Sequence, residues 1–170
     1  FAAICMHPDE VACKELWMKA FGDDEQFADS FIMRYYSRRR MLTAEAEGRT
    51  AAMLHLLPFR TELGRTTYIY GVATDPAFRG RGLASQLMRE AMRLIADRGD
   101  DAAFLIPTPG KEWLREFYGR FGFAGDVPTE FVSADRFDFG TGDAAADRAM
   151  VWRRTPEGPL PEQLTASWHS

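Results

Sequence analysis

The feature that most constrains the fold is a strand, a glycine-rich turn, a helix and a second strand in direct succession. Residues 66–74 ("TTYIYGVAT") are rich in Thr, Tyr, Ile and Val, a composition typical of a strand. Apolar positions in residues 82–98 recur with a period of 3.6 and predict a helix, with Gly99 placed to cap it. Residues 102–107 ("AAFLIP") are apolar throughout, as in a strand buried on both faces. This order predicts a parallel crossover within a sheet.

The remaining segments predict further helices and strands in the order β-αα-βββ-α-β-α-ββ. We expect strands at 1–6, 40–46, 49–59, 129–134 and 147–154 and helices at 8–21, 23–39 and 111–123. The fold class is therefore α/β (α+β), with a single mixed, mostly antiparallel sheet, a central parallel pair and about four flanking helices. A chain of 170 residues suits one domain, at residues 1–154, and the Pro-rich tail at 155–170 predicts irregular structure.

Composition excludes several classes of partner. The net charge of −4 and the isoelectric point of about 5.4 disfavour a nucleic-acid partner held by phosphate contacts. Cys5 and Cys13 are the two cysteines, too few for a disulfide framework or a zinc site, and we expect no metal. No apolar run approaches the length of a membrane span, and no signal peptide is recognisable. We expect a cytoplasmic protein with no membrane partner, either a monomer or a homodimer.

The turn before the helix at 82–98 carries the sequence Arg79-Gly80-Arg81-Gly82. The N–H groups at a helix N-terminus point outward and the helix dipole adds partial positive charge, while glycine lets an anion approach the backbone. The arginines add charge-assisted donors. The alternative is that the glycines serve only the turn and the arginines are solvated. Neither a G-x-G-x-x-G fingerprint nor the Lys-Ser/Thr pair of a P-loop is present.

Two blocks resemble the signatures of the GCN5-related N-acetyltransferase (GNAT) superfamily. "YGVATDPAFRGRGLASQLM" (70–88) resembles its strand, turn and R/Q-x-x-G-x-G/A helix opening, here read at residues 79–84. "FYGRFGF" (117–123) resembles the second block, an F-Y-x-(K/R)-x-G-F sequence on the next helix. The blocks occur in the family's order, with a predicted strand between them. The resemblance implies the GNAT fold over about residues 1–154.

The resemblance also implies acetyl-CoA as co-substrate, with its pyrophosphate on the turn. Strand residues before the turn would hold the pantetheine arm. Many relatives place an Asn after the next strand, where this chain has Pro107-Thr108-Pro109, so that Thr108 could replace one hydrogen bond. The cofactor-binding residues so implied are Val72, Ala73, Thr74, Arg79, Gly80, Arg81, Gly82, Leu83, Ala84 and Thr108.

For catalysis, the resemblance implies that the tyrosine of the second block, Tyr118, protonates the departing thiolate. A phenol with a pKa of about 10 suits that role at neutral pH. The alternative for Tyr118 is core packing. A backbone N–H near Gly71 or Val72, where the family's strand bulges, would donate to the oxyanion.

The general base is open at this stage. Many relatives carry a carboxylate on the strand before the turn, but this strand offers only Tyr68 and Tyr70, which alternation places on one face. Candidates elsewhere are Glu130, His55 and Glu62, and the sequence does not separate them.

The resemblance implies an acetyl-CoA-dependent N-acetyltransferase, an acyltransferase transferring groups other than aminoacyl groups. A primary amine of a small molecule or peptide would attack directly in a ternary complex, and residues 131–139 would form one wall of the acceptor site. One alternative is a non-catalytic acyl-CoA-binding regulatory module. Another is a domain that keeps the fold without the ligand.

Overall fold

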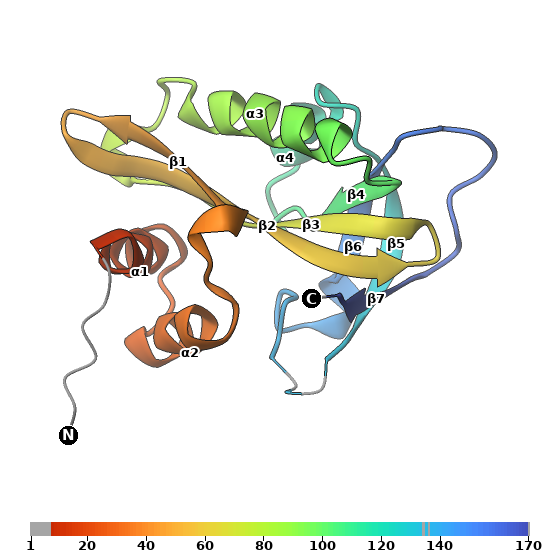
Figure 1. Ribbon diagram of the computed structural model, residues 1–170, viewed down its shortest axis with the longest axis horizontal. Helices are drawn as coiled ribbons and strands as arrows, with labels where there is room; N and C mark the ends of the chain where they lie inside the picture. Colours follow the sequence, from red (N-terminus) through yellow and green to blue (C-terminus); the bar gives the residue numbers. More distant parts are fainter. Residues whose placement is uncertain (1–7, 134, 136, 170) are drawn as a thin grey trace. The chain divides into compact units, whose positions relative to one another are not determined.

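The computed structural model describes residues 8–133, 135 and 137–169 (Figure 1). The predicted strand at 1–6 lies outside these residues. The helices are α1 (Pro8–Phe21), α2 (Glu25–Tyr35), α3 (Leu83–Asp97) and α4 (Trp113–Gly119), with 3-10 turns at Arg38–Arg40, Pro76–Phe78 and Ala144–Ala146. The strands are β1 (Met41–Ala46), β2 (Arg49–Thr61), β3 (Gly64–Thr74), β4 (Ala102–Leu105), β5 (Ala124–Val132), β6 (Arg148–Arg153) and β7 (Leu164–Trp168).

The strands form one mixed sheet in the order β1-β2-β3-β4-β6-β5-β7, with a further pairing between β2 and β7. β3 and β4 are parallel, with Thr66 opposite Ala102, and α3 connects them in the chain. This confirms the crossover predicted from the apolar run at 102–107. All four residues of β4 are buried, as expected for a strand covered on both faces. The predicted fold class, a mixed sheet with a central parallel pair and four helices, is confirmed.

The chain divides into two compact units. Unit 1 holds the described residues up to His55 together with Gly71–Met88, and unit 2 holds Leu56–Tyr70 together with the chain from Arg89 onward. None of the described helices is long and apolar enough to cross a membrane.

In unit 1 the helices α1 and α2 share an aromatic core. The rings of Trp17 and Phe31 stack with centroids 4.8 Å apart, and both side chains are buried. Asp24 begins α2 by accepting a 2.8 Å hydrogen bond from the backbone N–H of Phe27, as an N-cap residue does. The predicted helix at 23–39 is too long, because the backbone becomes extended at Tyr36 and a 3-10 turn precedes β1.

In unit 2 the core is a cluster of aromatic rings on β2, β3, β4 and the strands that follow. Tyr68 stacks on Phe104 with ring centroids 4.5 Å apart and planes 5° apart. Phe59 packs edge-on against the same two rings and against Phe139. Tyr68 and Tyr70 lie 5.2 Å apart by ring centroids, as strand alternation predicted.

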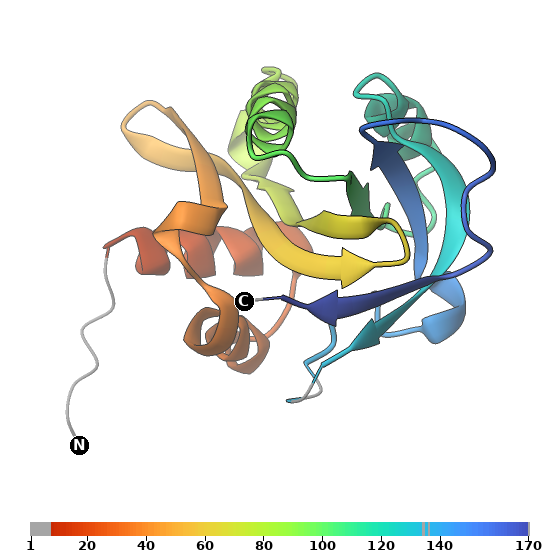
Figure 2. The ribbon, with the colours of Figure 1, turned by 45° about the vertical axis from the view of Figure 1, so that its right-hand side comes forward.

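The prediction of an irregular tail is wrong for Leu164–Trp168. These residues form β7, which pairs in parallel with β5 and antiparallel with β2, so that β7 runs beside β5 in Figure 2. Leu164 and Ala166 are buried, whereas the other three residues of β7 are partly exposed. The prolines that suggested irregular structure end at Pro161, and the following segment has the alternation of a half-buried strand.

Candidate functional site

The turn between β3 and α3 has a backbone that only glycine adopts readily. Gly80 and Gly82 have φ values of +81° and +76°, in the left-handed region. A Cβ atom at either glycine would have no neighbouring atom within 4 Å, so the surroundings of the turn are open. The Gly82 carbonyl accepts a 3.1 Å hydrogen bond from the N–H of Gln86, at the start of α3. The first N–H groups of an α-helix have no partner within the helix, so this end of α3 can receive an anion.

The two arginines of the turn differ in their surroundings. The Arg81 guanidinium lies 4.9 Å above the ring of Phe78, and its Nη1 lies 3.6 Å from a carboxylate oxygen of Glu47. Arg79 is exposed, and the described residues include no ion-pair partner for it. Arg79 is therefore the freer of the two to meet an anion.

Asp75, at the end of β3, holds the start of the turn through several hydrogen bonds. Its carboxylate is buried and accepts hydrogen bonds from the Ala77 N–H at 3.0 Å and from Arg49 at 3.1 Å, with Lys19 Nζ at 3.4 Å. The hydrogen bond from Ala77 and the two cations lower the pKa of this carboxyl below its ordinary value. Its backbone N–H donates to the Ala51 carbonyl at 2.7 Å, which ties the end of β3 to β2. The strand predicted at 66–74 ends one residue before Asp75, and no sequence pattern indicated these contacts.

Gly71 interrupts β3 with a φ of +64°, within the stretch expected to supply the oxyanion donor. A Cβ atom here would lie 2.8 Å from Cζ3 of Trp17 and 3.0 Å from Cδ2 of His55. Backbone conformation and close packing both require glycine at this position. Val72, Ala73 and Thr74 follow it on β3, and the side chain of Ala73 is buried.

Tyr118 lies on α4, which is shorter than the predicted helix at 111–123. Its side chain is 7% exposed and packs edge-on against Phe117, with ring centroids 5.1 Å apart. Burial raises the pKa of Tyr118 to about 12. The phenol is therefore protonated at neutral pH and holds a proton that it could donate. Thr108, in the loop before α4, is exposed.

The three candidate bases lie in different environments. Glu130 is exposed on β5, with Gln163 Nε2 3.4 Å from its carboxylate. Glu62 is also exposed, and its carboxylate accepts hydrogen bonds from the Thr165 N–H at 2.8 and 3.1 Å, which holds β7 in place. His55 is 1% exposed, and burial lowers its pKa to about 3. Glu130 is thus the candidate whose carboxylate faces a cavity.

That cavity, which we call the acidic pocket, lies in unit 2 and has a volume of about 610 Å³. It combines aromatic and acidic side chains from β5, the loop before β6 and the tail. The resemblance had implied an acceptor wall at residues 131–139, and several of these residues line the pocket. Ala144 and Asp147 were missed because they lie in a polar, Gly-containing insert without periodicity. The pocket is lined by Pro128, Thr129, Glu130, Phe131, Ser133, Phe137, Asp138, Phe139, Ala144, Asp147 and Gln163.

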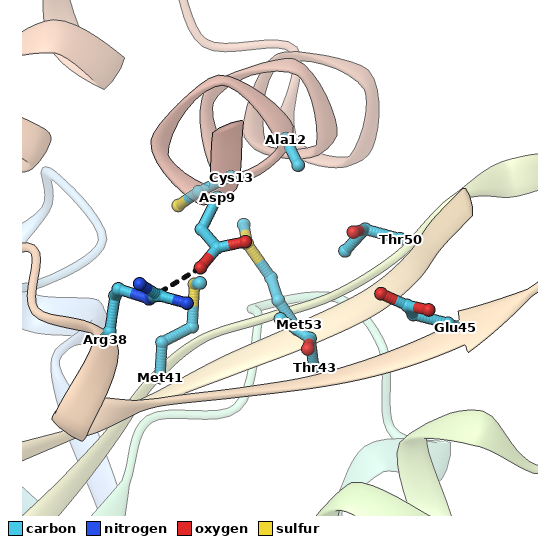
Figure 3. Close-up of a pocket in the computed structure, with 9 residues that line it drawn as sticks. All are labelled: Asp9, Ala12, Cys13, Arg38, Met41, Thr43, Glu45, Thr50 and Met53. Carbon is cyan, nitrogen blue, oxygen red and sulfur yellow. Dashed lines mark ion pairs between the residues drawn. The ribbon is translucent and has the colours of Figure 1, made fainter. Parts of the chain in front are cut away.

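A smaller cavity of about 210 Å³ lies in unit 1, between α1 and the β1–β2 hairpin (Figure 3). Asp9 of α1 and Arg38 face each other there, joined by a 2.7 Å ion pair. Cys13 also lines this cavity, and burial raises the pKa of its thiol to about 12, so it is a poor nucleophile. None of the predicted site residues lines it. Within the described ranges, no group of three or more His, Cys, Asp or Glu side chains could hold a metal ion.

Comparison with known proteins agrees with the family resemblance of the two sequence blocks. A family model described as an acetyltransferase (GNAT) domain matches residues 7–125. No curated protein matches the chain.

Three solved structures illustrate the similarity in fold. A GNAT family N-acetyltransferase (YhbS) from Escherichia coli in complex with CoA is 16% identical, with a TM-score of 0.65 over 96% of this chain and 86% of that chain. A GNAT family acetyltransferase from Brucella melitensis in complex with acetyl-CoA is 17% identical, with a TM-score of 0.62 over 97% and 93%. The ribosomal-protein-S18-alanine N-acetyltransferase from Escherichia coli is 15% identical, with a TM-score of 0.60 over 90% and 92%.

Proposed function

Because the chain belongs to the GNAT acetyltransferase family, we propose that it is an acetyl-CoA-dependent N-acetyltransferase. The acceptor is a primary amine of a small molecule or peptide, which attacks directly in a ternary complex. The observation that carries this proposal is the turn at the head of α3, where Gly80 and Gly82 hold left-handed backbone in open surroundings. Such a turn suits a diphosphate held by backbone N–H groups.

The turn residues fit the phosphates of acetyl-CoA, since nothing would meet a side chain at either glycine and the backbone is open to approach. Two similar proteins have structures with CoA and acetyl-CoA, which agrees with this assignment. Arg79 and Arg81 would add charge, and residues 72–74 of β3 would hold the pantetheine arm. Thr108 would supply one further hydrogen bond.

The chain's own residues supply the proton transfers. A base takes a proton from the ammonium form of the acceptor, and the neutral amine forms a C–N bond as the thioester C–S bond breaks. A backbone N–H near Gly71 or Val72 donates to the oxygen that becomes negative. Tyr118 donates its proton to the departing sulfur, and the phenolate is reprotonated by the proton that the new amide nitrogen loses. We assign the base to Glu130, because His55 is enclosed and Glu62 is held by Thr165.

We further propose that residues 1–154 form the acyltransferase domain and that the tail at 155–170 adds β7 to its sheet. The competing function is a regulatory module that binds acyl-CoA without turnover, and the absence of a carboxylate on β3 favours it. The tyrosine at position 118, where the family's second block carries its general acid, favours the enzyme.

Calorimetric titration with acetyl-CoA, a longer acyl-CoA and free CoA tests the proposal. We expect micromolar binding of acetyl-CoA, followed by thiol release when primary amines are added. Binding without thiol release for any amine would support the regulatory module. No binding of any of the three compounds would refute both functions.

A further inference from the structure

The acidic pocket has an aromatic floor. Phe137 and Phe139 are buried at 7% and 0% exposure, with ring centroids 4.8 Å apart, and Phe131 lies 5.8 Å from Phe139. The same rings continue into the core through Tyr68, whose hydroxyl donates a 2.6 Å hydrogen bond to the Phe139 carbonyl. The floor is therefore fixed by packing and by a buried hydrogen bond, and Phe131 is the partly exposed ring that it offers to a ligand.

Three carboxylates surround this floor without a cation. Glu130, Asp138 and Asp147 all line the pocket, and no lysine or arginine within the described ranges forms an ion pair with any of them. Asp126 on the same strand β5 is different, because Arg115 and Arg148 both lie 2.9 Å from its carboxylate. Among the described residues, these three carboxylates therefore have no cationic partner.

The carboxylates are held by contacts that leave their charge in place. Asp138 accepts a 2.9 Å hydrogen bond from the Gly140 N–H, and Asp147 accepts from the backbone and hydroxyl of Thr141 at 2.7 and 2.8 Å. These neutral donors orient the side chains without neutralising them. The negative charge also acts on Tyr68 beneath the floor. Burial raises the pKa of Tyr68 most, followed by Tyr70, and Asp147 and Asp138 raise it further.

We propose that the acidic pocket binds a small cation with an apolar body, and that the amine acceptor belongs to the arylalkylamine class. The positive charge of the amine would meet the carboxylates of Glu130 and Asp138, and its ring would lie against Phe131, which Phe137 and Phe139 support from the core. A volume of about 610 Å³ suits a molecule of this kind. The assignment as acceptor rests on the proposed acetyltransferase function, whereas the binding of the cation does not.

Calorimetry tests the binding directly, with 2-phenylethylamine as the probe. 2-Phenylethanol has the same ring without the charge, and phenylalanine adds a carboxylate to the same skeleton. We expect 2-phenylethylamine to bind about tenfold more tightly than either, since hydrogen bonds to charged groups are the strong ones. Equal binding of the three compounds, or binding of none, would overturn the proposal.

Variants locate the site. Asp138→Asn keeps an acceptor for the Gly140 N–H and removes the charge, so we expect it to weaken 2-phenylethylamine binding about tenfold. Glu162→Gln is the matched control, an exposed carboxylate beside Gln163 that does not line the pocket, and it should leave binding unchanged. Loss of binding in both variants, or in neither, would contradict the assignment.

Turnover then separates this inference from the proposed function. In thiol-release assays with acetyl-CoA, we expect Asp138→Asn to raise KM for 2-phenylethylamine with kcat unchanged, and ethanolamine to be a poor acceptor. Thiol release with equal preference for both amines would reject the acceptor class and leave the acetyltransferase intact. If no amine gives thiol release, the proposed function fails while the calorimetry still decides the pocket.

Discussion

The glycine-rich turn of unit 1 and the acidic pocket of unit 2 would recognise their proposed ligands by opposite means. The turn consists of consecutive residues at 79–84 and presents backbone N–H groups. Its glycines matter because they have no side chain to block the approach to the backbone. The pocket consists of side chains from β5, the loop before β6 and the tail, so its residues matter for the charge and rings that they carry. The first kind of site tolerates little change in backbone and the second little change in side chain.

This difference has a functional meaning in a transferase. A cofactor common to many enzymes can be held by backbone geometry that many sequences share. An acceptor particular to one enzyme requires side chains placed by the fold, and fold alone does not specify them. Substitution of the turn glycines changes the backbone, and the other substitutions change side chains, so that the two means of recognition can be separated.

The largest effect is expected when valine replaces both Gly80 and Gly82. Left-handed backbone costs an L-residue roughly 1–2 kcal/mol, and more when the side chain is β-branched. Two such substitutions should weaken acetyl-CoA binding about 100-fold or more, measured by calorimetry. The matched control is Gly158→Val, since Gly158 has a φ of +72° and equally open surroundings in the tail. Equal loss of affinity in the control would show that general strain, and not the turn, is responsible.

Tyr118→Phe is expected to lower kcat about 100-fold while leaving the affinity for acetyl-CoA unchanged, because it removes a general acid. The matched control is Tyr36→Phe, since burial also raises the pKa of Tyr36 to about 12 and its hydroxyl has no hydrogen-bond partner among the described residues. Stopped thiol-release assays at saturating amine measure both variants. A similar loss in both, or none in Tyr118→Phe, would remove this residue from the mechanism.

The sequence predicted the turn and most of the fold because both depend on local patterns. The period of α3, the apolar run of β4 and the Arg-Gly-Arg-Gly turn are each contained in one short segment. Tyr118 followed from a resemblance on α4. The buried state that raises its pKa depends on tertiary packing, which no local pattern reports.

The acidic pocket was predicted only in part, and β7 was not predicted. The resemblance implied an acceptor wall at residues 131–139, which includes Asp138. Asp147 lies in an insert without periodicity, and only the folded chain brings it to Glu130 and Gln163. β7 follows a Pro-rich segment, and its two strand partners β2 and β5 are distant in sequence. Long-range pairing of this kind is decided by the whole sheet.

His55 was one of the three candidate bases for the acceptor amine, so its protonation state bears on the assignment of the base to Glu130. Burial lowers its pKa to about 3 from an ordinary value of 6.5, so the folded protein favours the neutral imidazole. The contribution of His55 to the free energy of unfolding is therefore fully present above pH 6.5. It falls by about 1.4 kcal/mol per pH unit as the pH decreases from 6.5 toward 3. Urea midpoints at pH 7.5 and 5.5 measure this slope.

We expect His55→Leu to have a shallower acid slope than the parent, and His169→Gln, which changes an exposed histidine, to keep the parental slope. Parallel slopes for the parent and His55→Leu would mean that the imidazole titrates normally in the folded protein. His55 would then be a candidate base again, and deprotonation of the acceptor amine would no longer be assigned to Glu130 alone.

The smallest effect concerns the two arginines of the turn. Arg79 is exposed without an ion-pair partner in the described residues, whereas Arg81 must leave Glu47 and the Phe78 ring to meet a phosphate. We therefore expect Arg79→Ala to weaken acetyl-CoA binding about tenfold and Arg81→Ala about threefold. Both losses should decrease as salt screens the charges.

Calorimetry at two ionic strengths measures this order, with Arg39→Ala as a control that removes the same charge from the exposed turn before β1. Glu47→Gln provides a second test, because it removes the competing carboxylate and should bring the contribution of Arg81 closer to that of Arg79. If Arg81→Ala is the more damaging variant in both backgrounds, the predicted order of the two arginines is wrong. A loss in either arginine variant as large as that of the double glycine variant would show that side-chain charge directs binding at the turn, and the contrast between a backbone site and a side-chain site would then no longer hold.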